Sequence, residues 1–194
     1  RWFETLVSVQ RASASSGEFY RQTAHAVVDL IGLDSGLVLL RRGERWEIVA
    51  QHTPDENLEV GFSRSVLDRV CHEKRTFFSG APEGSATASL RGVDAVVAAP
   101  VLADEDRVVG VVYGTRMQRP GLTTVQVRPL EAQLVQILAA TVGAGLARLA
   151  SEADARARSQ LGKRDAGVAQ FSHGFDHRVD DLLPTRLFDE GGWW

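Results

Sequence analysis

Two histidines near the C-terminus have the spacing of metal ligands on a helix. His173 and His177 lie four residues apart, with Asp176 between them and Asp180 and Asp181 shortly after. Side chains four apart share one face of a helix, so a helical segment would direct both imidazoles to one metal ion. The acidic residue beside the second histidine is aspartate, unlike in the usual zinc-binding helix motifs. The alternative is an amphipathic segment exposed to solvent.

Other reactive side chains form no recognisable catalytic set. No serine, histidine and acid occur at a known motif spacing, and no glycine-rich phosphate-binding loop precedes a helix. Cys71 is the only cysteine, which excludes an intrachain disulfide and a cysteine zinc cluster. It indicates a reducing compartment, so a cytoplasmic location is expected. Catalysis within this chain is not expected.

Size and charge narrow the classes of function further. A chain of 194 residues with 44% hydrophobic residues can bury one sizeable core. The formal net charge of -3, without a long basic run, gives no electrostatic footprint for nucleic acid. No apolar run reaches the about 20 residues of a membrane helix, and no signal peptide is recognisable, so no membrane partner is expected. The chain opens on Arg1 without a methionine, which suggests an excised piece of a longer protein.

The stretch from Val93 to Arg116 is the centre of the predicted fold. It consists of two β-branched runs joined by a short acidic turn at 104–106, the pattern of a β-hairpin. Both runs are apolar at nearly every position, so the hairpin should be central in a sheet that is covered on both faces. A second hairpin is predicted from 37–40 and 46–50, and an edge strand at 77–78.

Helical spacing of apolar residues occurs on both sides of these strands. The small residues of the last helix, at 140, 143, 144 and 147, would let another helix approach closely, although alanine also simply favours helix. Beyond Ser151 the alternating charges indicate a solvated helical linker, weakened by Gly162 and Gly167. The predicted helices cover 2–10, 18–31, a segment capped by Ser63 or Ser65 that ends near Arg75, and a long segment from Thr123, Thr124 or Pro129 to Leu149.

This order of elements resembles the GAF domain family, a sensor module of bacterial signalling proteins. The similarity lies in GLVLL and RWEIVA, in GFSRSVLDRVCHEKRTFF, and above all in VDAVVAAPVLADEDRVVGVVYGTR with LTTVQVRPLEAQLVQILAATVGAGLARL. The resemblance implies an α+β fold: a central six-stranded antiparallel sheet with the N- and C-terminal helices on one face, and a small helix with loops over a pocket on the other. It divides the chain into a GAF-like sensor domain at 1–150 and a linker and tail at 151–194.

The resemblance also implies a regulatory, non-enzymatic role. GAF domains dimerise through their terminal helices, bind a small molecule or have lost it, and pass a conformational signal along the C-terminal helix. The expected partners are a second copy of the chain, a small-molecule ligand and a covalently attached output domain such as a cyclase, kinase or phosphatase. The tail segments FDHRVDDLL and RLFDEGG weakly resemble the linker to a class III nucleotide cyclase. The alternatives are a ligand-free dimerisation scaffold and a metal- or haem-binding sensor.

The ligands known in the family can be compared with this chain one by one. The Asn-Lys-X-Asp-Glu set of cyclic-nucleotide-binding members is absent, and methionine sulfoxide reduction needs more than one cysteine. Cys71-His72 resembles the attachment pair of bilin-binding members, but it falls in a helix and not just before the strand at 93–101, so the expected role is that of a small buried residue. His25 and His52 are the conceivable haem ligands, although such histidines are more often structural. The cofactor is left unknown.

Six side chains are predicted to border a ligand, if one binds. Phe62 and Tyr113 would supply an apolar wall, and Ser63, Arg91 and Thr115 would orient the ligand by hydrogen bonds. The sixth is His52, at the end of a predicted strand. The alternative for each is a packing or surface residue, and no catalytic or metal-binding residue is assigned.

Overall fold

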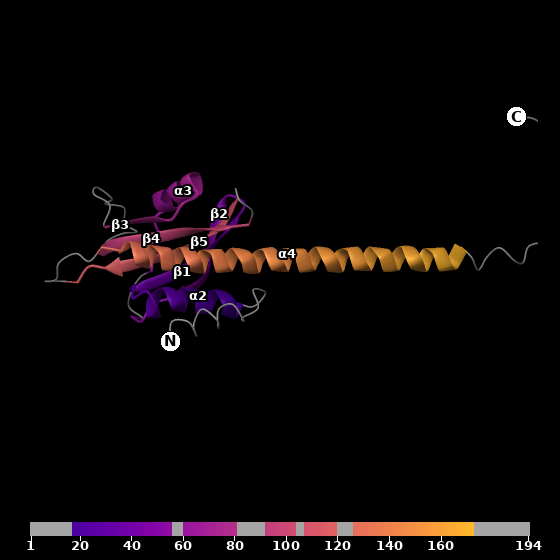
Figure 1. Cartoon of the computed structure of the whole chain (residues 1–194), viewed down its shortest axis with the longest axis horizontal. Helices are drawn as coiled ribbons and strands as arrows, with labels where there is room; N and C mark the ends of the chain where they lie inside the picture. Colours follow the sequence, from indigo (N-terminus) through magenta and orange to yellow (C-terminus); the bar gives the residue numbers. More distant parts are fainter. Residues whose placement is uncertain (1–16, 56–59, 81–91, 104–106, 120–125, 173–194) are drawn as a thin grey trace, which may run out of the picture. The chain divides into compact units, whose positions relative to one another are not determined.

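The computed structural model describes residues 17–55, 60–80, 92–103, 107–119 and 126–172. By its contacts the chain divides into two units, 1–151 and 152–194, and the fold below is that of the first unit. Figure 1 shows that this unit contains both helices and strands. In chain order the elements are α2 (Gly17–Asp29), β1 (Ser35–Arg42), β2 (Arg45–His52), α3 (Arg64–Glu73), β3 (Phe77–Gly80), β4 (Val93–Leu102), β5 (Val108–Met117) and α4 (Pro129–Ser172).

The strands form one antiparallel sheet in the order β2-β1-β5-β4-β3. Both predicted hairpins are confirmed, since β1 pairs with β2 and β4 pairs with β5. Seven of the ten residues in each of β4 and β5 are buried and the others are half-buried, as expected for strands covered on both faces. The α+β class is confirmed, but the described residues contain five strands and not six. The sequence itself contains five strand-like runs. The sixth strand was expected only because of the resemblance to the GAF domain family.

Helices α2 and α4 cover one face of the sheet. Phe19 and Val27 of α2 and Val135 and Leu138 of α4 are buried in one apolar cluster with alternate residues of β4. Gly36 on β1 allows this packing, because a Cβ there would lie 2.4 Å from the backbone oxygen of Ala24. The predicted arrangement of terminal helices on one face is therefore confirmed for α2 and α4, while the predicted helix at 2–10 lies outside the described residues.

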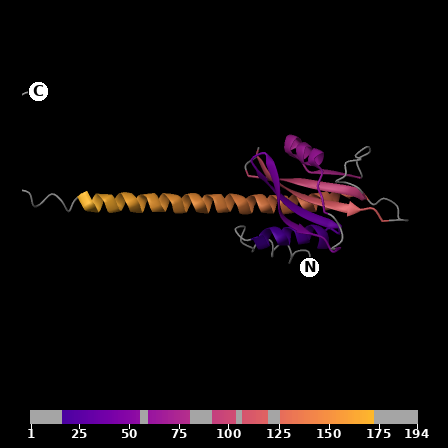
Figure 2. The same ribbon diagram turned by 180° about the vertical axis from the view of Figure 1, so that it is seen from behind.

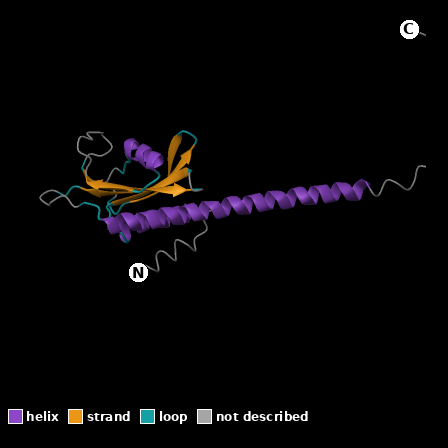
Figure 3. Cartoon of the chain, turned by 45° about the horizontal axis from the view of Figure 1, so that its top comes forward, coloured by secondary structure: helices purple, strands orange, loops and turns teal. Residues whose placement is uncertain are grey.

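The single helix α3 covers the opposite face (Figure 3). Val66, Leu67 and Val70 are buried there against the side chains of β1, β4 and β5, with Tyr113 at the centre. Ser63 occupies the N-cap position as predicted, but its hydroxyl makes no capping hydrogen bond. The apolar stripe of α3 is therefore what holds the helix on the sheet.

Helix α4 begins at Pro129, the N1 position that suits a proline because its missing N–H would have no partner there. It continues to Ser172 through Gly162 and Gly167, so these two glycines do not interrupt the helix. Gly143 lies against the end of β4, where an added Cβ would be 2.5 Å from the carbonyl oxygen of Leu102. Gly143 therefore lets α4 approach strand β4, whereas the sequence pattern suggested a contact of this small residue with another helix.

The region 129–159 of α4 is long and apolar enough to cross a membrane by length and composition, with a mean hydropathy of 1.5 over its best window. The sequence prediction did not identify it. Part of its apolar surface is used within the first unit, because Ala132, Val135, Leu138 and Val142 are buried against the sheet. Leu130 and Ile137 remain exposed.

Candidate functional site

Three of the six predicted ligand residues lie together where α3 begins. Tyr113 points from β5 towards α3 and is fully buried, and its hydroxyl accepts a hydrogen bond of 3.2 Å from the backbone N–H of Ser63. The Ser63 hydroxyl in turn bonds to Ser65, and Phe62 packs against the same apolar cluster. Burial raises the pKa of Tyr113 to about 12, although the Ser63 N–H lowers it. Tyr113 is therefore a neutral phenol that fixes the start of α3.

Thr115 lies on the same face of β5 as Tyr113, since the two are separated by one residue. Its hydroxyl is buried and shares a hydrogen bond with the hydroxyl of Ser35 on the paired strand β1. This pair joins two strands across the middle of the sheet. A ligand would have to compete with it to use Thr115.

The structure places His52 elsewhere. It ends β2 and lies beside α2, where its ring stacks on that of His25 at a centroid distance of 3.5 Å. Asp29, the last residue of α2, is close to both rings. Burial is the main cause that lowers the pKa of His52, with a smaller contribution from His25, while Asp29 acts in the opposite direction. His52 thus belongs to a separate cluster and does not join Tyr113.

Arg91, the sixth predicted ligand residue, lies outside the described residues, as do the tail histidines His173 and His177 with Asp176. Most of the loop expected at 79–89 lies outside them too. The ligand-binding role of the six residues stays a prediction.

A groove lies on the first unit between β3, β4 and the start of α4, and it contains none of the six predicted residues. Its volume is about 620 Å³. Within the described part of the chain, the Thr76 Oγ1 atom in its lining is buried without a hydrogen-bond partner. The lining is formed by Lys74, Arg75, Thr76, Phe78, Pro100, Leu102, Pro129, Ala132, Gln133, Gln136 and Ala140. Two cationic side chains and two amides at one groove suit a small polar or anionic molecule.

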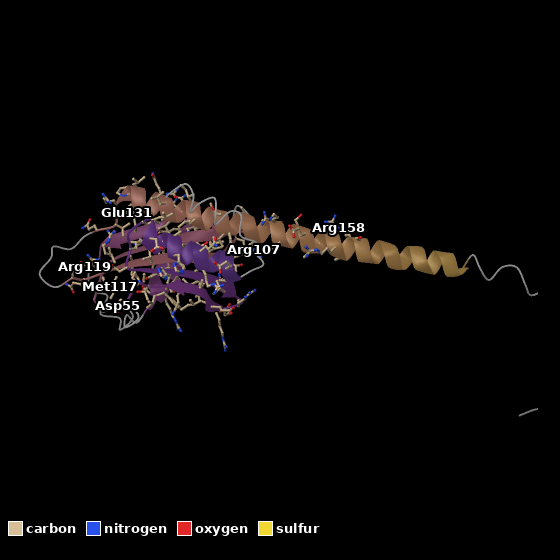
Figure 4. The ribbon with its side chains drawn as sticks, turned by 90° about the horizontal axis from the view of Figure 1, so that it is seen from below. Asp55, Arg107, Met117, Arg119, Glu131 and Arg158 are labelled. Carbon is tan, nitrogen blue, oxygen red and sulfur yellow. The ribbon has the colours of Figure 1, made fainter. Side chains whose placement is uncertain are left out.

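A buried ion pair holds the start of α4 on the sheet. Glu131, labelled in Figure 4, accepts a hydrogen bond of 2.8 Å from the backbone N–H of Arg128 and further bonds from the Arg128 and Arg116 guanidinium groups. Arg116 also donates to the backbone oxygens of Gln126 and Gly32. Burial alone would raise the pKa of Glu131, but the hydrogen bonds from Arg128 and Arg116 together hold it below its ordinary value. The pair therefore connects the end of β5, the turn after α2 and the start of α4.

Cys71 has the environment of a packing residue. It lies on α3 and is partly buried against the apolar cluster beneath that helix. Burial raises the pKa of its thiol more than Arg41 lowers it, and Asp68 raises it further. The thiol form, which is the poorer nucleophile, is therefore favoured.

Comparison with known proteins decides the family. The family model described as GAF domain matches residues 15–148, more than two thirds of the chain. The chain belongs to the GAF domain family. No curated protein matches it in sequence.

Solved GAF domains share this fold at low sequence identity. The GAF domain of a phosphoenolpyruvate-protein phosphotransferase from Coxiella burnetii is 10% identical with a TM-score of 0.62, covering 79% of this chain and 94% of that one. The blue-light absorbing form of the Thermosynechococcus elongatus PixJ GAF domain is 16% identical with a TM-score of 0.56, covering 80% and 94%. The corresponding Acinetobacter phosphotransferase GAF domain is 15% identical with a TM-score of 0.57, covering 77% and 94%. GAF domains are regulatory domains of sensor proteins, and this chain contains such a domain at residues 15–148.

Two features of this GAF domain were missed from the sequence. Asp29 was not recognised as a neighbour of the histidines, because 23 positions separate it from His52 along the chain. The groove beside α4 was missed because its lining comes from three separate stretches of sequence. An acidic residue four positions after His25 was the only available signal for the first feature.

Proposed function

We propose that this GAF domain is a small-molecule-sensing and dimerisation module that passes a conformational change along α4 to an output domain. Family membership supports the regulatory part of this proposal. The observation that carries the rest is that α4 both lines the groove and presents apolar side chains to solvent. The proposal includes a cytoplasmic location and a covalently attached output domain in a longer protein.

The groove supplies a direct route from a ligand to α4. Ala132, Gln133, Gln136 and Ala140 occupy successive turns of α4 along the groove, so a bound molecule would contact the helix itself. Helix α4 is continuous across residue 151, where the first unit ends. A ligand that fits one position of α4 better than another would shift the helix towards that position.

Exposed apolar residues of α4 support a contact with a second copy of the chain. Leu130 is 65% exposed and Ile137 is 45% exposed, and their separation of seven residues puts them on one side of the helix. The small residues Ala140, Ala144 and Ala147 are also exposed. Two such helices can pack closely and remove this surface from water.

A second candidate function is that of a dimerisation scaffold without a ligand. The face beneath α3, where the sequence predicted a pocket, contains Tyr113, Leu37, Leu67 and Val96 as fully buried side chains. The protein's own residues occupy this space, as the scaffold requires. The two candidates differ only in whether a small molecule is retained.

Native mass spectrometry of the full chain purified from its own host tests ligand binding. The sensing module predicts an added mass that is lost in Ala140→Phe, which fills the groove. Ala150→Phe is the matched control, because this exposed residue of α4 lies neither in the lining nor on the side of Leu130 and Ile137. Loss in Ser63→Ala instead would place the ligand beneath α3, as the sequence predicted. Absence of any added mass would favour the scaffold.

Sedimentation equilibrium tests the dimer contact. Ile137→Glu should weaken dimerisation at least tenfold, since a carboxylate would be buried in an apolar contact. Ile48→Glu is the matched control, because Ile48 is 39% exposed on the edge strand β2, away from α4. An unchanged dimer in Ile137→Glu, or a monomeric wild type, would refute this contact.

A further inference from the structure

A cluster of three potential metal ligands lies where the end of α2 meets the end of β2. His25 and Asp29 are four residues apart on α2, so they share one face of the helix. His52 approaches from β2, and one ligand atom from each residue can be chosen so that all three lie within 4.8 Å of one another. We propose that His25, Asp29 and His52 form a binding site for a divalent transition-metal ion such as Zn²⁺.

Tight packing of α2 on the sheet brings these residues together. In the sheet register His52 is the partner of Gly36 on β1. A Cβ at Gly36 would lie 2.4 Å from the backbone oxygen of Ala24, so only glycine lets α2 come this close, next to His25. Seen from behind in Figure 2, the indigo α2 runs along the purple strands β1 and β2. Two regular elements therefore hold the three side chains, as a preorganised site requires.

The donor set has the chemistry of a zinc site. Two imidazoles and one carboxylate are ligands that Zn²⁺ accepts at about 2.0–2.2 Å, with water in a fourth position. The set differs from the all-oxygen ligation that Mg²⁺ and Ca²⁺ prefer, so these ions should bind weakly.

Only side-chain rotation separates the present geometry from coordination. The Asp29 carboxylate lies 3.8 Å from Nδ1 of His25 and 3.9 Å from Nε2 of His52. Tetrahedral zinc would bring such atoms to about 3.3 Å from one another. The rings now stack at an interplanar angle of 21°, so one ring must tilt to direct its lone pair at a shared ion. The side chains of His25 and Asp29 are 51% and 63% exposed, which leaves them free to adjust.

Titration of the metal-free full chain with zinc chloride, followed by calorimetry and by metal analysis after dialysis, tests the site. The wild type should bind one zinc ion per chain and unfold at a higher temperature when loaded. Asp29→Asn and His25→Ala should each weaken binding at least about tenfold, because even the loss of a residue that only supports a metal ligand costs about that much. Asp29→Asn keeps the shape of an exposed side chain, so folding is not at risk. Magnesium chloride should give no comparable signal.

Two control variants separate this site from the other histidines. His72→Ala removes an exposed histidine from α3 and should bind zinc as the wild type does. The double variant His173→Ala/His177→Ala removes the tail pair and should also retain the ion. Loss of zinc in the tail variant, unchanged affinity in both Asp29→Asn and His25→Ala, or a wild-type Kd above about 1 mM would overturn the proposal.

Discussion

On one face of the sheet Gly36 and Gly143 bring the backbones of α2 and α4 against the strands, whereas on the other face the ten-residue α3 packs through its apolar side chains. Neither Gly36 nor Gly143 has room for a Cβ, so a larger residue at either position would push its helix away from the sheet. Helix α3 lacks a side-chain cap, and the backbone N–H of Ser63 instead bonds to Tyr113. The comparison indicates that the α3 face can rearrange at lower cost than the α2–α4 face.

A leucine-to-alanine substitution in the core of each face should reveal the difference in rigidity between the two faces most strongly. Leu138 of α4 and Leu67 of α3 are both buried almost completely. We expect Leu138→Ala to lower the free energy of unfolding by about 4 kcal/mol and Leu67→Ala by about 2–3 kcal/mol, because α3 can settle into the cavity. Urea denaturation measures both. Equal losses, or a larger loss at Leu67, would show that the two faces are equally rigid.

A smaller effect is expected where α4 touches β4. Gly143→Ala places a Cβ 2.5 Å from the carbonyl oxygen of Leu102, so the helix must shift. Overpacking costs about 1–3 kcal/mol and the gain in helix propensity is about 1 kcal/mol, so we expect a net destabilisation of about 0–2 kcal/mol. Gly17→Ala on α2 is the control, since no atom of the described residues lies within 4 Å of its added Cβ. A stabilised Gly143→Ala protein would contradict the close contact.

Removal of the Tyr113 hydroxyl tests how α3 is attached. Tyr113→Phe leaves the buried N–H of Ser63 without its acceptor and should cost about 1–2 kcal/mol by urea denaturation. Hydrogen exchange should also speed up at the start of α3 and remain unchanged in α2. Tyr20→Phe is the control, because Tyr20 lies on α2, away from Ser63. Exchange that changes equally in both helices would remove the distinction between the faces.

A pH dependence is expected at the start of α4, on the α2–α4 face. The pKa of Glu131 is lowered in the folded protein, so its ionised form contributes stability above the ordinary value of 4.5. This contribution is lost as the pH falls through the folded pKa. We expect Glu131→Gln to be about 1–3 kcal/mol less stable at pH 7, because Arg116 loses its partner, and the gap to narrow below pH 4.5. A gap that is constant from pH 7 to below 4.5 would contradict the ion pair.

Local patterns predicted most of the elements of this fold. The hairpin at 93–116, the hairpin from 37–40 and 46–50 and the N1 proline Pro129 each depend on neighbours in sequence, so their structures agree with the prediction. The candidate site was predicted less completely. Phe62, Ser63 and Tyr113 do lie together, but His52 joins α2 instead, because the side of a strand that a residue faces depends on the register of the whole sheet.

The sequence by itself determined the class of fold, because the hydrophobic periods of 2 and 3.6 residues and the turn residues are short-range properties of this chain. The tertiary structure alone decided which distant side chains meet. Glu131 beside Arg116, and Asp29 beside His52, depend on how closely each helix approaches the sheet. That approach is set by glycines such as Gly36 and Gly143, whose partners are far away in sequence.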